Sequence, residues 1–121
     1  MRFEMTNKPL IEVGLAPEFI QRLKRLIKKF PHAAEDVQGL IARLEQGETP
    51  GDQVPGVRYT AYKVRLKSRD VPKGKSSGFR VIYYIQTRTR VILITLYIKS
   101  EQVDIRAEDI RHIIEDFESP D

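Results

Sequence analysis

The run Val-Ile-Leu-Ile-Thr-Leu-Tyr-Ile at positions 91–98 limits the possible folds more than any other part of the sequence. It is apolar along its length and shows no regular alternation between apolar and polar residues. Such a run is typical of a strand with both faces largely covered. We therefore expect this segment to lie centrally in a sheet.

Three further segments complete the expected sheet. Residues 10–15 are expected to form the first strand, and residues 58–68 and 79–86 precede the apolar run. Within the second of these, residues 62–67 alternate strictly between apolar and basic, which is typical of a strand with one buried face. Thr87–Arg90 is expected to be a hairpin turn, so the last three strands form an antiparallel sheet.

Apolar residues at helical spacing predict three helices. The first begins near Pro17, where a proline costs no hydrogen bond, and Pro31 ends it. The second covers about residues 33–46, with Gly47 placed to cap it at the start of a loop that extends to Gly56. The last covers about residues 104–117. The positions expected to be buried are Phe19, Ile20, Leu23, Leu26, Ile27 and Phe30, then Val37, Leu40, Ile41 and Leu44, and finally Ile110, Ile113, Ile114 and Phe117.

The composition fits one globular domain. A chain of 121 residues supports a single modest core, so we expect one domain at residues 10–121, preceded by a flexible arm at residues 1–9. There is no cysteine, which excludes disulfides and thiol nucleophiles. No apolar run approaches the roughly 20 residues of a membrane span, and no signal-peptide core is present. The sequence therefore predicts a cytoplasmic α+β protein with no membrane partner.

Positive charge is concentrated in one stretch of the chain. Between Arg58 and Arg80 there are eight Lys or Arg residues and one acid, a local charge of +7, whereas the whole chain carries +4. Strand alternation puts Lys63, Arg65 and Lys67 on one face, and Arg80 follows on the next strand. Such a row is either the ordinary solvent face of a half-buried sheet or a surface for a polyanion.

Other chemistry is poorly supported by the sequence. His32 and His112 are the only histidines and have no metal-ligand spacing. The loop Lys-Gly-Lys-Ser-Ser-Gly at 73–78 is not a P-loop, because the upstream glycine and the following helix are missing. The acidic residues of 101–121 predict a solvated helix or, alternatively, an intramolecular cover over the basic surface. What remains is a site of Lys and Arg with Tyr nearby, for which no metal or cofactor is expected.

Three short motifs carry a likeness to a known family. They are Tyr-Lys-Val-Arg-Leu at 62–66, Gly-Lys at 74–75 with Gly-Phe-Arg-Val-Ile-Tyr-Tyr at 78–84, and Leu-Tyr-Ile-Lys-Ser-Glu at 96–101. Together they resemble the RelE/ParE superfamily of bacterial toxins, closest to the RelE and HigB branch of ribosome-dependent mRNA interferases. The likeness covers about residues 10–117. It implies a RelE-like order of an N-terminal strand, a two-helix hairpin, a three-stranded antiparallel sheet and a C-terminal helix.

The resemblance also implies roles for individual residues. The expected catalytic residues are Lys63, Arg65, Arg80 and Lys99. The expected RNA-binding residues are Lys67, Lys73, Lys75 and Tyr84. Some family members place a tyrosine where this chain has Ile105, so Tyr84 or Tyr97 would have to substitute for it.

RNA carries its own nucleophile, the 2′-hydroxyl, which would attack the scissile phosphate. The fork of N–H donors of Arg80, expected at the surface, would stabilise the phosphorane with help from Arg65. Lys63, crowded by other cations, would act as base, and Lys99 would protonate the leaving 5′ oxygen. The family implies that the ribosome orients the mRNA and that a cognate antitoxin protein covers the site.

Two other functions remain open from the sequence. A ParE-like toxin shares the fold but poisons DNA gyrase, and it does not need cations at positions 63, 65 and 80. A non-enzymatic RNA-binding module would only grip phosphates, although the strand surface lacks the aromatic pairs that single-strand binders use. The strand cations favour the mRNA endonuclease, which inhibits translation.

Overall fold

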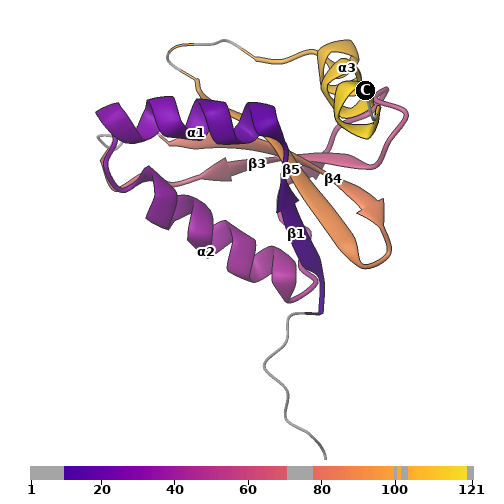
Figure 1. Ribbon diagram of the computed structural model, residues 1–121, viewed down its shortest axis with the longest axis horizontal. Helices are drawn as coiled ribbons and strands as arrows, with labels where there is room; N and C mark the ends of the chain where they lie inside the picture. The colour runs from indigo at the N-terminus through magenta and orange to yellow at the C-terminus, as the bar shows by residue number, and fades with distance from the viewer. Residues whose placement is uncertain (1–9, 71–77, 100, 102–103, 120–121) are drawn as a thin grey trace, which may run out of the picture.

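A computed structural model of the chain describes residues 10–70, 78–99, 101 and 104–119 (Figure 1). The predicted arm at residues 1–9 and the loop cations Lys73 and Lys75 lie outside the described residues. None of the described helices is long and apolar enough to cross a membrane. The predicted α+β class is confirmed by the order of elements, which is β1 (Glu12–Leu15), α1 (Pro17–Lys29), α2 (Ala33–Glu45), β2 (Asp52–Gln53), β3 (Ala61–Leu66), β4 (Phe79–Thr87), β5 (Arg90–Ile98) and α3 (Ala107–Glu118).

One mixed sheet holds the five strands of the described chain, in the order β1-β5-β4-β3-β2. β3, β4 and β5 pair antiparallel, whereas β1 runs parallel to β5. β2 is a two-residue strand on the edge beside β3, within the segment predicted to be a loop. β5 lies between β1 and β4 and is buried from Val91 to Ile98, as its uniformly apolar sequence predicted.

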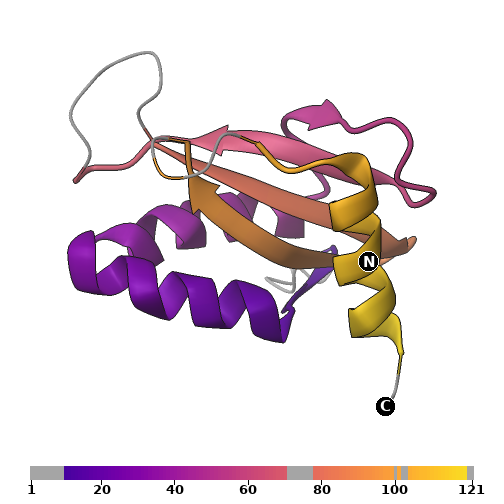
Figure 2. The same cartoon turned by 90° about the horizontal axis from the view of Figure 1, so that it is seen from above.

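Helices α1 and α2 lie together on one face of the sheet (Figure 2). Their core joins Phe19 of α1 and Leu40 of α2 to Val81 and Leu93 of the strands, and each of these side chains is at most 2% exposed. Ile20 was predicted to belong to this buried stripe, but it is 37% exposed. It follows Phe19 by about 100° around the helix, and Phe19 already fills the position that faces the sheet.

Helix α3 packs against the opposite face of the sheet. Ile110 and Ile114 are buried there against Ile82 and Tyr84 of β4 and Ile92 of β5. In Figure 1 the short helix (yellow) lies at one end of the sheet, away from α2. It therefore covers only part of this face, and Lys63, Arg65 and Arg80 lie on the remainder.

The largest differences from the predicted boundaries are at the starts of β3 and α3, each for a local reason. β3 begins at Ala61 rather than near Arg58, because Arg58 adopts a positive φ of 78° in a preceding turn, which a strand does not allow. α3 begins at Ala107 rather than at Asp104. The Asp104 carboxylate instead accepts hydrogen bonds at the basic end of the sheet.

Gly78 sets the register between β3 and β4. Its φ is +91°, and a Cβ at this position would lie 2.4 Å from the carbonyl oxygen of Leu66. Only glycine combines this backbone conformation with so close an approach. The next residues then pair in a fixed register, with Phe79 opposite Leu66 and Arg80 opposite Arg65.

Candidate functional site

Strand pairing aligns three polar residues in one row across the sheet. Arg65 of β3 lies opposite Arg80 of β4, and Arg80 lies opposite Tyr97 of β5. Directly opposite residues of antiparallel strands project from the same face. Lys63, two residues before Arg65, projects from that face too. Because Ile82, further along β4, already packs under α3, the row lies where the helix cover ends.

A small hollow of about 40 Å³ gathers five side chains at this place, which are Lys63, Arg80, Tyr97, Lys99 and Asp104. Three of the four residues predicted to be catalytic thus line one hollow, although they come from β3, β4 and the end of β5. Arg65, the fourth, is exposed in the same row and does not line the hollow. The arrangement can hold a small anionic group against three cations.

Asp104 places a carboxylate among these cations. Its two oxygens lie 3.1 and 3.2 Å from Lys63 Nζ. It also accepts hydrogen bonds from the Tyr97 hydroxyl at 2.7 Å and from the Ile105 backbone N–H at 2.9 Å. The bond from Tyr97 is the largest of the effects that hold the pKa of Asp104 below its ordinary value. The ionised carboxylate therefore ties β3 to β5 across the hollow.

Tyr97 is a buried hydrogen-bond donor in this site. Its side chain is 4% exposed, and burial, followed by the contact with the Asp104 carboxylate, raises the pKa of its phenol above the ordinary value. The phenol is therefore neutral at physiological pH. Of the two tyrosines considered as substitutes at position 105, Tyr97 is the one that the structure places in the hollow. Ile105 itself packs against the core beneath α3.

Arg80 is less exposed than the sequence predicted. Its Nη1 atom is buried and has no hydrogen-bond partner among the residues that the structure describes. A buried donor without a partner costs stability, and the cost is larger for a charged group. The expectation of a guanidinium at the surface is thus wrong for this nitrogen, because the side chain lies in the hollow between β3 and β5.

Tyr84 does not lie with the RNA-binding candidates on the surface. It is 1% exposed beneath α3, and its hydroxyl donates to the Glu118 carboxylate. Burial first, and then this contact, raise the pKa of Tyr84, and the same hydrogen bond lowers the pKa of Glu118. Alternation along β4 puts Tyr84 on the same face as Arg80 and Ile82, but α3 covers this part of the face. The prediction that Tyr84 contacts RNA is therefore wrong in this structure, because the side chain is buried under that helix.

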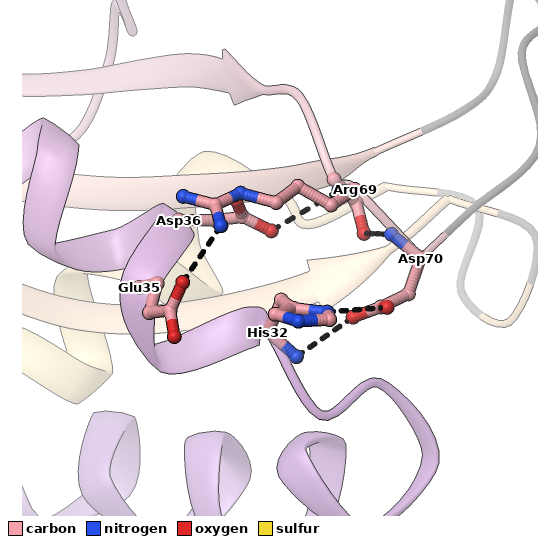
Figure 3. A network of polar contacts seen from close by, with 6 residues as sticks. His32, Glu35, Asp36, Arg69 and Asp70 are labelled. Carbon is pink, nitrogen blue, oxygen red and sulfur yellow. Dashed lines mark hydrogen bonds and ion pairs between the residues drawn. The ribbon is translucent and has the colours of Figure 1, made fainter.

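The segment after β3 is held to α2 and not to the hollow (Figure 3). Arg69 Nη1 lies 2.7 Å from a Glu35 oxygen and Arg69 Nε lies 3.4 Å from Asp36. Asp70 accepts hydrogen bonds from the backbone N–H of His32 at 2.8 Å and contacts His32 Nδ1 at 2.9 Å. The hydrogen bond to Asp70 raises the pKa of His32. Arg69 thus belongs to a structural network.

The remaining sequence candidates lie outside the hollow. Arg58 and Lys67 are exposed, the first in the turn before β3 and the second just after its end. Sequence reasoning missed Asp104 as a site residue, since it grouped this carboxylate with the acidic C-terminal helix. The one signal of a role for Asp104 at the site is that it precedes the helix rather than lying within it.

No protein-family model matches the chain, and no curated protein or solved structure matches it either. Among residues 10–70, 78–99, 101 and 104–119, no three His, Cys, Asp or Glu side chains lie close enough together to hold a metal ion.

Proposed function

We propose that this protein is a RelE-like toxin of a type II toxin–antitoxin system that cleaves mRNA on the ribosome. The observation that carries the proposal is the convergence of Lys63, Arg80 and Lys99 around Tyr97. A guanidinium nitrogen of Arg80 in their midst has no partner within the described part of the chain. Of the described residues, Asp104 is the one carboxylate among these three cations, so the hollow keeps a net positive charge that favours a further anion. The order of a strand, two helices, an antiparallel strand set and a last helix also supports the proposal.

The reaction that suits this site is attack of the RNA 2′-oxygen on the adjacent phosphorus. The bond from phosphorus to the 5′-oxygen then breaks, which leaves a 2′,3′-cyclic phosphate and a 5′-hydroxyl. Arg80 would bind the equatorial oxygens, where one additional negative charge develops, because its fork matches phosphate geometry. Arg65, opposite Arg80 on β3, reinforces the positive field.

Two proton transfers must accompany these steps. The 2′-hydroxyl loses a proton and the departing 5′-oxygen gains one. Lys63 remains the proposed acceptor, in its neutral amine form, and Asp104, 3.1 Å from its Nζ, orients it. Lys99 is the proposed donor to the 5′-oxygen. Asp104 is a positioning residue, because it holds both Lys63 and Tyr97.

Orientation of the mRNA is the part that this site does not supply. The hollow is shallow, and no buried histidine with a pKa near neutrality lies among its lining residues. We therefore assign the in-line orientation of the mRNA to the ribosome. Such orientation lowers the activation barrier by several kcal/mol. A cognate antitoxin would silence the toxin by covering the hollow.

The test is to map mRNA 5′ ends in cells after induction of the wild-type protein, Arg80→Ala and Arg88→Ala. Arg88 is a matched control, since it is an exposed arginine in the β4–β5 turn. We expect growth arrest and new 5′ ends within translated regions for the wild type and Arg88→Ala, but not for Arg80→Ala. Arrest without new mRNA ends, together with loss of DNA supercoiling, would instead indicate the gyrase-poisoning alternative. Normal growth with soluble, folded wild-type protein would leave a non-enzymatic RNA-binding module.

A further inference from the structure

A second, larger depression adjoins the hollow on the other side of Tyr97. It has a volume of about 340 Å³ and lies between α1 and the end of β5, and we call it the α1–β5 groove. Tyr97 lines both the groove and the hollow. A ligand chain that reaches both depressions must therefore pass around the edge of β5 at Tyr97.

Cations form the rim of the groove. Arg22, Arg25 and Lys29 contribute three positive charges from one side of α1, and Glu101 contributes the one carboxylate. Lys29 Nζ lies 2.8 Å from that carboxylate, and Arg22 pairs with Glu18 of its own helix at 3.2 Å. In the part of the chain that the structure describes, no carboxylate pairs with Arg25. Arg25 thus offers its charge to a ligand.

The floor of the groove is apolar. It is lined by residues of α1 and β5, among them Leu26, Leu96, Tyr97 and Ile98. An apolar floor beneath an arginine rim suits a nucleotide, because the flat base can lie on the apolar surface while arginines hold the phosphate. The volume also falls within the range of ordinary small-ligand pockets.

We propose that the α1–β5 groove binds one nucleotide of the RNA strand, next to the phosphate held at Arg80. This inference rests on the proposed function and adds a subsite to it. The groove would hold the strand beside the cleaved bond and would read the base that rests on its floor. Arg25 would contact the phosphate of that nucleotide.

The test uses a single-stranded oligoribonucleotide of about eight residues with 2′-O-methyl sugars, which cannot be cleaved. Its affinity is measured by fluorescence anisotropy for the wild type, Arg25→Ala and Lys24→Ala over a range of salt concentrations. Lys24 is the matched control, because it is an exposed cation of the same helix that does not line the groove. We expect Arg25→Ala to weaken binding about tenfold. The slope of log affinity against log salt concentration should also fall by an amount that corresponds to about one released ion. Lys24→Ala should change the affinity less than about twofold.

A cross-linking experiment locates the base directly. An oligonucleotide with a single 4-thiouridine is irradiated with the wild-type protein, and the attached peptides are identified by mass spectrometry. We expect attachment within residues 22–29 or 96–98. Equal effects of the two alanine variants, or attachment elsewhere, would overturn the groove proposal. Competition by a poly-glutamate peptide without any RNA cross-link would instead indicate an acidic protein segment as the occupant.

The two proposals fail in different ways. If the wild type cleaves mRNA but Arg25→Ala and Lys24→Ala behave alike, the groove proposal is wrong and the proposed function stands. If RNA attaches in the groove but no mRNA is cleaved in cells, the proposed function is wrong and the subsite remains.

Discussion

Replacing Arg80 by methionine should stabilise the fold while it removes the activity. Methionine keeps an unbranched apolar stem of similar reach but has no charged head. The change eliminates a buried guanidinium nitrogen that no described residue satisfies with a hydrogen bond. It also relieves the repulsion from Arg65, which lies directly opposite on β3.

The magnitude follows from these two contributions. An unsatisfied buried donor costs about 1–3 kcal/mol, and like charges directly opposite in a sheet destabilise it by a few tenths to about 1 kcal/mol. The loss of van der Waals contacts around the guanidinium offsets part of the gain. We expect a net stabilisation of about 1 kcal/mol, which for a domain of this size corresponds to a Tm higher by about 4 °C.

Thermal unfolding and ribosome-dependent mRNA cleavage are measured on the same preparations. We expect Arg80→Met to lower cleavage about 10²–10³-fold, as is typical for removal of one preorganised donor to transition-state charge. Leu93→Ala is the opposite control, because Leu93 is fully buried in the core. It should cost about 2–5 kcal/mol of stability but leave cleavage per folded molecule intact. A Tm for Arg80→Met that falls by several degrees would show that this arginine is a structural group and would refute the reasoning.

Three further perturbations test other parts of the structure. Asp104→Asn should strengthen RNA binding, because the hollow loses a negative charge. It should nevertheless slow cleavage by up to about 10²-fold, because Lys63 and Tyr97 lose the group that positions them. If binding assays and single-turnover rates showed both quantities unchanged, the role assigned to Asp104 would be wrong. Gly78→Ala should lower the free energy of unfolding in denaturant titrations by more than about 1 kcal/mol, since its Cβ would meet the Leu66 carbonyl oxygen, whereas an unchanged midpoint would contradict this. The Tm difference between the wild type and His32→Asn should be larger at pH 5.5 than at pH 8.5. The pKa of His32 is raised, so its contribution is full below its ordinary 6.5 and is lost as the pH rises through the folded-state value. The pKa of Asp70 is lowered, so its contribution is full above its ordinary 3.8 and is lost as the pH falls through the folded-state value. A difference that grows with pH would contradict the ion pair.

The order of helices and strands was readable from the sequence because each element repeats a simple pattern. Residues 91–98 are apolar on both strand faces, and the structure covers both. The two-residue strand β2 was not predictable in this way, because it is too short to show a period and exists only through its pairing with Lys63 and Tyr62 of β3. Ile20 was wrongly predicted to be buried, because an apolar residue beside the buried stripe cannot be told in the sequence from one within it.

The site was predictable only in part, for physical reasons. Alternation put Lys63 and Arg65 on one face of β3, and the glycine before Phe79 fixes the register that brings Arg80 beside them. No pattern in the sequence shows that a residue between β5 and α3 reaches back to contact β3. The partnership of Asp104 with Lys63 depends on that long-range contact. Tyr84 was misassigned for a related reason, since the sequence does not show which part of the sheet face α3 covers.

The most direct test of the central claim is the chemistry of the cleaved ends. Purified ribosomes programmed with a defined mRNA are treated with the wild-type protein, and the termini of the fragments are identified by mass spectrometry. We predict a 2′,3′-cyclic phosphate on one fragment and a 5′-hydroxyl on the other, and no cleavage when the nucleotide before the scissile phosphate carries a 2′-deoxy sugar. Cleavage that persists at the 2′-deoxy site would contradict attack by the 2′-oxygen and, with it, the role assigned to the cationic hollow.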